Sequence, residues 1–401
     1  MAKRKIQKPT RFERMYKVWD YLRKNTDRRH PTSIAKMRKD ENINAYIGDK
    51  ETINRLLKDM ANIMNLEDGG SDYKPEAEWR LYFDDFKKFY GDKERYERDD
   101  SDEDDSYIAN VMRIKNLYYN RTFSEKEVDS IIEGIMATRT LDSKSAQELV
   151  RKVEDNMTTA FYKRTPRHIC KVQEPELADR ELLKDNLAII QKAIDDNVRI
   201  QFRFNGYSYE KKLEPVRAEM DELSPYYIVA SGGKYYLLAA KEYEGYKPNM
   251  SIWRIDLMTD IEIPGRNDRL HIKGIPRIPK KNVSNLPEKW SEDFQLKHLN
   301  MSFDKPVPVT LRIKSEKCED NPKKRVRPGY TFLHDWFGDS FTYIRTEKEP
   351  PYDDIVRVEC SPYGMAHWAL QYSELVEVLE PESLREDIKI KIKALNEKYS
   401  L

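Results

Sequence analysis

The sequence predicts a multidomain α+β protein: a winged helix-turn-helix unit, a helical connector, a small β-barrel and a ferredoxin-like α+β domain. At 401 residues the chain is too long for one ordinary hydrophobic core. Apolar residues recur at helical spacing up to about residue 163 and at alternate positions between residues 198 and 262. Strand-like and helix-like segments then alternate over the last hundred residues.

Total charge does not indicate a partner, because 72 Lys and Arg residues balance 71 Asp and Glu residues. No apolar run is long enough to span a membrane, and the start of the chain lacks the apolar segment of a signal peptide. Cys170, Cys318 and Cys360 are far apart and form no CxxC pair. We therefore expect a reduced, cytoplasmic protein without a disulfide framework.

Residues 1–83 are predicted to form the winged helix-turn-helix unit. A helix is expected to start near Arg11, and "TSIAKMRKD" reads as a short second helix. The third, "DKETINRLLKDMANIMNL", is amphipathic, with Asp49 as its N-cap. The following "GGSDYKPEAEWRLYF" is expected to form the β-hairpin wing.

Two further segments precede the barrel. Residues 84–118 form a dense charge run, which is typical of a solvated insertion or linker. Residues 119–178 are predicted to be a helical connector, because Ser124 and Glu127 form a capping box and a second helix start follows at Asp142 or Ser143.

A predicted helix over residues 179–196 opens the barrel domain, which extends to residue 265. Five short strands follow, including a hairpin with a tight turn at Gly232-Gly233 and a last strand "SIWRIDLMTDIEI". Residues 266–303 read as a connection with one helix near Pro287–Leu299, and residues 304–401 as the α+β domain.

The barrel segment resembles the WYL domain. The family's Trp-Tyr-Leu tripeptide corresponds to Tyr235-Tyr236-Leu237, and its Phe-Arg-x-Asp-Arg-Met element corresponds to residues 253–258, "WRIDLM". "LEPVR" is similar to the strand before the family's hairpin, "DKETINRLLKDM" to its recognition helix, and "HDWFGDSFTYI" to its C-terminal extension.

The resemblance implies a bacterial transcriptional regulator. Its winged helix-turn-helix would bind double-stranded DNA, its Sm-like or SH3-like barrel would sense a single-stranded nucleic acid or a nucleotide, and its extension would help to form a homodimer. Some relatives belong to phage defence. The alternative is therefore an accessory protein of a CRISPR or other defence system that binds single-stranded RNA or DNA.

The predicted ligand site lies on the strands of the barrel. Arg254 is the strongest candidate, because a planar guanidinium suits bidentate contacts with phosphates or bases. The alternative is an internal ion pair with Asp256, and the two are compatible if Asp256 orients Arg254. Tyrosines here either fill the core or stack on a base. The full set of candidates is Arg254, Asp256, Tyr226, Tyr236, Ser224, Arg217, Lys211 and Arg203.

Two departures from the family pattern affect these sites. Leu257 stands where the family has a second arginine, which removes a cation from the ligand site. Glu51 precedes Thr52 in the recognition helix where an arginine is usual. The expected DNA contacts are Lys50, Thr52, Asn54, Arg55 and Lys58, and the alternative is a helical module for protein contacts.

The sequence carries no motif of a known active site. His334, Asp335 and Asp339 lack a second histidine at ligand spacing, and a phosphate-binding Gly-rich loop, a nucleophile elbow and HExxH are all missing. We therefore expect neither an enzyme nor a bound metal or cofactor.

Overall fold

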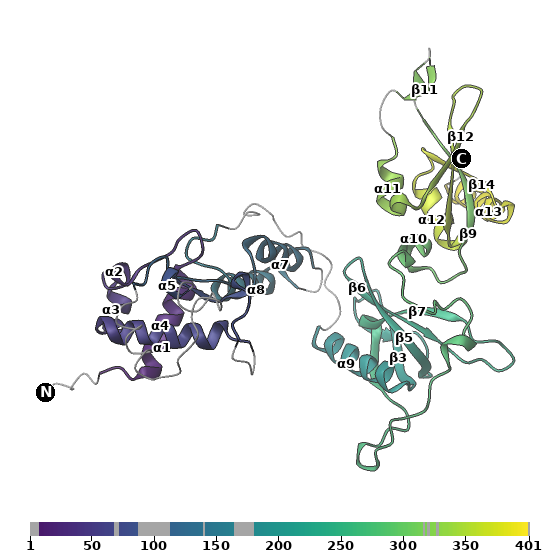
Figure 1. Cartoon of the computed structure of the whole chain (residues 1–401). Coiled ribbons are helices and arrows are strands. Elements are labelled where there is room, and N and C mark those ends of the chain that lie inside the picture. Colours follow the sequence, from purple (N-terminus) through teal and green to yellow (C-terminus); the bar gives the residue numbers. More distant parts are fainter. Residues whose placement is uncertain are drawn as a thin grey trace. The chain divides into compact units, whose positions relative to one another are not determined.

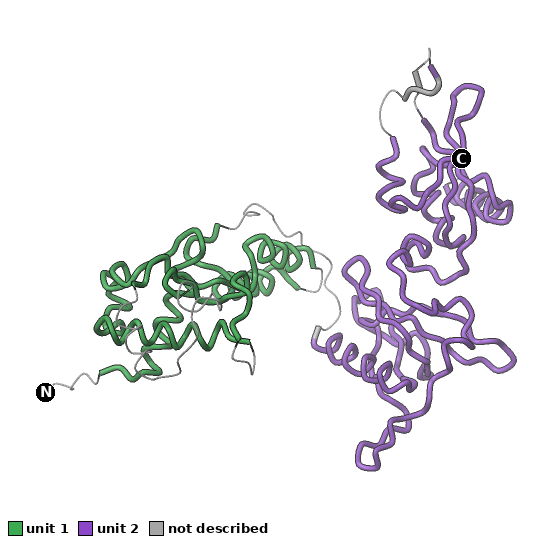
Figure 2. Tube along the Cα trace, in the orientation of Figure 1, with its two compact units in different colours: residues 1–174 green, residues 175–401 purple. Residues whose placement is uncertain are grey.

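The structure, a computed structural model, divides the chain into two compact units, residues 1–174 and 175–401 (Figure 2). It describes residues 8–67, 72–86, 113–138, 141–163, 180–315, 317–318, 321–325 and 329–399. Most of the predicted charged insertion and the end of the predicted connector therefore lie outside the described residues. Among the helices that are described, none is long and apolar enough to cross a membrane.

Helix caps explain where the helices of the first unit begin. Thr10 and Ser124 each form a capping box with the glutamate three residues on, and Asp49 and Asp142 accept hydrogen bonds from the first turns that follow them. The helices are α1 (Arg11–Asn25), α2 (Ile34–Met37), α3 (Glu41–Ile47), α4 (Lys50–Asn65), α5 (Asp84–Phe86), α7 (Glu125–Ala137) and α8 (Ser143–Met157) (Figure 1).

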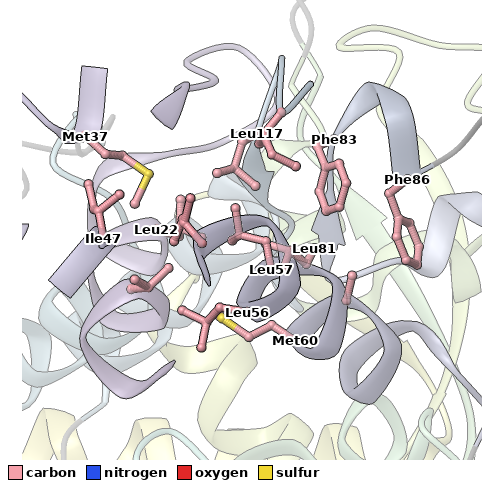
Figure 3. Close-up of a cluster of buried hydrophobic side chains, with 14 of the residues drawn as sticks. Leu22, Met37, Ile47, Leu56, Leu57, Met60, Leu81, Phe83, Phe86 and Leu117 are labelled. Carbon is pink, nitrogen blue, oxygen red and sulfur yellow. The ribbon is translucent and has the colours of Figure 1, made fainter. Parts of the chain in front are cut away.

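One hydrophobic core joins the helices that surround α4. Figure 3 shows Leu22 of α1, Met37 of α2 and Ile47 of α3 around Leu57 of α4. Leu117 belongs to the same core, so the chain returns to this unit after the charged insertion. Helices α7 and α8 pack against each other around a separate, smaller core.

The β-hairpin predicted for residues 69–83 is not observed where the structure describes this segment. Residues 76–78 form a 3₁₀ turn, and strand β1 (Leu81–Tyr82) pairs instead with β2 (Tyr118–Tyr119). The distant pairing brings the rings of Tyr82 and Tyr118 into a stack with centroids 5.0 Å apart. This aromatic contact favours a partner from beyond the insertion over a local hairpin.

The second unit begins with a curled, half-closed barrel that α9 (Arg180–Asp196) covers. The strand order is β4-β3-β5-β6-β7, and β8 returns to pair with β3. Gly232 and Gly233 both have positive φ, as the predicted primed turn requires. The strands are β3 (Ile200–Tyr207), β4 (Leu213–Pro215), β5 (Asp221–Ser231), β6 (Lys234–Ala240), β7 (Met250–Arg254) and β8 (Met258–Glu262).

Two sequence predictions for this region are wrong. The predicted fifth strand is interrupted by a 3₁₀ turn at Ile255–Leu257, which separates β7 from β8. The helix predicted near Pro287–Leu299 shortens to α10 (Phe294–Lys297) and a 3₁₀ turn. The hydroxyl of Tyr227 lies within hydrogen-bonding distance of the backbone carbonyls of residues 287 and 288, the groups that a longer helix would use.

The last hundred residues form a four-stranded antiparallel sheet in the order β12-β13-β9-β14. Helix α11 (Thr331–Phe337) separates the first two of its strands along the chain, and α12 (Pro362–Gln371) separates the last two. This is the β-α-β-β-α-β order of ferredoxin-like domains. The strands are β9 (Val307–Ile313), β12 (Thr342–Thr346), β13 (Asp354–Cys360) and β14 (Val376–Glu380), and helix α13 (Glu382–Tyr399) follows.

Candidate nucleic-acid interface

Arg254 and Asp256 form a paired site at the end of β7. The guanidinium donates from Nε to Oδ1 of Asp256 at 3.1 Å and from Nη2 to Oδ2 at 2.5 Å. The Asp256 side chain is only 1% exposed, whereas that of Arg254 is 29% exposed. The N–H groups of Nη1 meet no acceptor among the described residues. The pair thus fixes one edge of the guanidinium and leaves another open to a ligand.

The electrostatics of this pair favour a permanent cation. Burial by itself would lower the pKa of Arg254, but the hydrogen bond and the negative charge of Asp256 outweigh it, so the pKa is raised. A guanidinium that is always charged and held in one orientation suits a phosphate oxygen or a base edge.

Two buried asparagines hold the turn that carries Asp256. Asn186 of α9 donates from Nδ2 to the carbonyls of Ile255 and Met258, at 3.2 and 2.8 Å. Asn205 of β3 donates to the carbonyl of Leu257 at 3.0 Å. Sequence reasoning missed both residues. Asn186 was detectable as a polar residue on the apolar stripe of its helix.

Two tyrosines lie beside Arg254. Tyr236 of β6 is its register partner across the sheet and interacts with it electrostatically, while burial raises the pKa of the Tyr236 hydroxyl. Tyr207, at the end of β3, is half exposed and also interacts electrostatically with the guanidinium. The structure therefore brings together three predicted site residues, Arg254, Asp256 and Tyr236, and adds Tyr207. Cations near tyrosine side chains are a combination that nucleic-acid sites use.

Ser224 and Tyr226 lie in the interior of the second unit. They are 1% and 2% exposed, and both bind the backbone of Ile278: Ser224 Oγ accepts from its N–H at 3.0 Å, and the Tyr226 hydroxyl donates to its carbonyl at 2.7 Å. Segment 276–278 therefore covers this part of β5. In this structure both side chains serve packing and have no surface to offer to a ligand.

Two of the three other predicted barrel cations form ion pairs away from Arg254. Arg217 pairs with the buried Asp221 and lies over the ring of Trp253 at 5.6 Å. Because Trp253 and Arg254 are neighbours in β7, they point to opposite faces of the sheet, and so Arg217 does not extend the Arg254 site. Arg203 pairs with Asp260 at 3.4 Å, and Lys211 is exposed at the turn between β3 and β4.

The predicted DNA-contacting residues divide into two groups along α4. Asn54 and Lys58 are 0% and 6% exposed and face the core of the first unit. The exposed residues are Lys50, Thr52 and Arg55. Helix α4 follows α3 after Gly48 and Asp49, so a short turn connects the two helices as in a helix-turn-helix.

Carboxylates neutralise much of the exposed face of α4. Arg55 donates to Glu51 at 2.7 Å, and Arg11 of α1 pairs with Asp59. These four residues line an open cavity of about 480 Å³ together with Arg14, Asp49, Thr52 and Leu56. This face therefore presents paired charges and not a continuous basic stripe.

The sheet and helices of the last hundred residues match a known domain family, WCX, over residues 305–395. Residues 305–395 are therefore similar to the WCX domain. WCX is the C-terminal extension associated with WYL domains, so the resemblance to WYL-domain proteins is confirmed. Helix α13 follows the sheet. Its Leu384 is buried, and its exposed apolar side chains are Ile390, Ile392, Leu395 and Tyr399.

Beyond the WCX domain, the comparisons give distant likenesses. No curated protein matches the chain. The solved structure of proteasome accessory factor B/C of Arthrobacter aurescens is 15% identical over 72% of this chain and 40% of its own chain, with a TM-score of 0.21. A CRISPR Cas-related protein is 13% identical over 76% of this chain and 75% of its own, with a TM-score of 0.29. TM-scores this low do not establish a shared overall fold.

Proposed function

We propose that this protein is a transcriptional regulator that binds a single-stranded nucleic acid or a nucleotide at Arg254 of its barrel, which we take to be a WYL domain of Sm-like type. The observation that carries the proposal is the Arg254–Asp256 pair, because a carboxylate that is 1% exposed orients a guanidinium that keeps an open edge. Nothing in this arrangement requires catalysis, and we propose a binding protein and not an enzyme.

In this proposal, α3 and α4 form the DNA-reading part of a winged helix-turn-helix. Lys50, Thr52 and Arg55 would contact duplex DNA, and Arg55 would exchange Glu51 for a phosphate or a base edge. Three exposed apolar side chains of α13, Ile392, Leu395 and Tyr399, share one helix face and support a homodimer, since a second copy could cover them. Ligand binding at the barrel would then change the spacing of the two DNA-reading helices.

A second function is favoured by the paired charges of α4. Because Glu51 and Asp59 neutralise Arg55 and Arg11, and Asn54 and Lys58 are buried, the helix has few free cations with which to hold a duplex. A defence-system accessory protein that binds single-stranded RNA or DNA through the barrel would need no duplex contact.

Fluorescence anisotropy at one fixed salt concentration separates the two functions. Labelled single-stranded RNA, single-stranded DNA and duplex DNA are titrated with wild type, Arg254→Gln and Arg55→Ala. For the regulator, Arg254→Gln weakens single-strand binding by about tenfold or more and Arg55→Ala weakens only duplex binding.

The matched control is Arg203→Gln, a barrel arginine whose partner is an exposed carboxylate. Tight single-strand binding without duplex binding would favour the accessory protein. If a folded Arg254→Gln protein keeps every affinity, Arg254 is not the ligand site.

A further inference from the structure

The first unit contains a cavity of about 870 Å³ that is lined by residues of this unit. Its walls come mainly from three segments: the loop between α1 and α2 at residues 27–30, the stretch from β2 into α7 at residues 119–129, and residues 157–163 from the end of α8 onward. Ala77 also contributes. A volume of this size falls within the range of small-molecule and cofactor sites.

Several cations line this cavity without an ion pair. Arg28, Arg29, Lys126 and Lys163 contribute to its wall, and none of them pairs with a carboxylate among the described residues. Arg121 adds a fifth cation, whose Nε is buried without a hydrogen-bond partner. Burial, together with the neighbouring charge of another arginine, lowers the pKa of Arg121.

Most carboxylates of the wall are already engaged. Asp27 accepts hydrogen bonds from the ring and backbone N–H groups of His30, Glu127 accepts from Ser124, and Asp129 accepts from Tyr162 at 2.6 Å. Only Glu125 lacks a hydrogen bond in the described part of the wall. The wall carries five Lys and Arg side chains against four carboxylates, and a carboxylate keeps its charge when a neutral group donates to it. The remaining excess of one positive charge favours an anionic ligand.

Flat aromatic surfaces accompany these cations. The ring of Phe161 stacks on that of His30, with centroids 4.1 Å apart and planes 15° apart, and Phe161 is still 42% exposed. Phe123, on another wall segment, is 40% exposed. A stacking surface beside unpaired cations is what a base with an attached phosphate requires.

We propose that this cavity is a second ligand site, which binds a nucleotide unit with its base against Phe161 and its phosphate among Arg28, Arg29, Lys126 and Lys163. The unit is either a free mononucleotide or one nucleotide of a single strand. Because one wall is the loop that leads into the predicted DNA-reading helices and another is the start of α7, an occupied cavity would tie these two segments together.

The test uses the full chain carrying Arg254→Gln, so that the barrel site does not contribute. N-methylanthraniloyl-ATP and fluorescein-labelled decathymidylate are titrated at one fixed salt concentration. Added to this background, Phe161→Leu is expected to weaken binding by about fivefold or more through the lost stacking, and Arg28→Ala with Lys163→Ala by a larger factor. Lys144→Ala, an exposed charge on α8 outside the cavity, should leave binding unchanged.

The outcomes separate this site from the barrel site. Binding that survives Arg254→Gln and falls with Phe161→Leu supports the cavity, and the probe that binds identifies the source of the nucleotide. If Arg254→Gln abolishes all binding, the proposed barrel site is supported and the cavity proposal is overturned. Equal binding by the Phe161, Arg28/Lys163 and Lys144 variants, each with the circular dichroism spectrum of the parent, also overturns it.

Discussion

Arg55 of α4 and Arg254 of β7 each donate to a carboxylate close by in the chain, yet their surroundings differ. The Arg55–Glu51 pair is 53% and 49% exposed, whereas the Arg254–Asp256 pair is 29% and 1% exposed. The exposed pair contributes little to stability, because water and salt screen it. The buried carboxylate depends on its arginine, since little water reaches it. The same kind of arginine–carboxylate pair therefore leaves Arg55 free to exchange its partner and holds Arg254 in one orientation.

The largest effect on stability is expected from Arg254→Ala, which tests whether Asp256 depends on its arginine. The substitution leaves the Asp256 carboxylate buried without its partner, so we expect the free energy of unfolding of the second unit to fall by about 2–3 kcal/mol. Urea denaturation followed by tryptophan fluorescence measures it, because Trp253 adjoins the site. Replacing both residues, Arg254→Ala with Asp256→Ala, should restore part of the loss. A single variant as stable as wild type would contradict a fixed pair.

A smaller effect is expected from Asn186→Ala. The change removes the donors to the carbonyls of Ile255 and Met258 and leaves these groups buried. The expected loss is about 1 kcal/mol, at the low end for such groups, because Oδ1 of Asn186 is itself buried without a partner. The affinity for single strands should also fall in Asn186→Ala, since the turn at Ile255–Leu257 orients Asp256. Asp185→Ala, the exposed neighbour on α9, is the control.

Local signals predicted much of the fold. Apolar spacing located α1 and α8, and side-chain caps together with apolar spacing located α4 and α7 with their N-caps. Helix α3 was missed, although Asp40 caps it and Ile43 and Ile47 are buried one turn apart. The wing prediction failed because β1 pairs with a strand that lies beyond the insertion. Local patterns cannot specify a partner that far along the chain.

In the candidate site, too, features that depend on residues close in sequence were predictable and those that depend on distant residues were not. The pairing of Arg254 with Asp256 was predictable, because the two residues are close neighbours in sequence. The burial of Ser224 and Tyr226 was not, because it depends on Ile278, more than fifty residues further on. On α4, the burial of Asn54 and Lys58 follows from the helical period and could have been read from their positions beside Ile53 and Leu57.

The stability of the second unit in mild acid tests one buried titrating side chain, His298. His298 is 5% exposed, stacks on Phe294 and hydrogen-bonds through Nδ1 to the carbonyl of Ser302 at 2.7 Å. Burial lowers its pKa below 6.5. As the pH falls, His298 therefore takes up a proton in the unfolded chain at a higher pH than in the folded protein. The contribution of neutral His298 to the free energy of unfolding is complete above about pH 6.5 and decreases as the pH falls toward the lowered pKa.

Urea denaturation between about pH 7.5 and pH 5 measures this loss. His298→Gln should flatten that part of the profile. The difference between variant and wild type at the higher pH gives the cost of the substitution itself. An unchanged slope in the variant would assign the acid sensitivity to carboxylates.

The smallest effect on stability is expected from Arg55→Ala, within about 0.5 kcal/mol, because both partners of its ion pair are half exposed. Its effect on duplex binding should be larger: if Arg55 leaves Glu51 for a phosphate, the slope of log K against log salt should decrease by about one. Glu51→Gln releases the arginine and should strengthen duplex binding. A stability loss as large as that of Arg254→Ala would show that exposure does not distinguish the two pairs, whereas an unchanged salt slope would place Arg55 away from DNA.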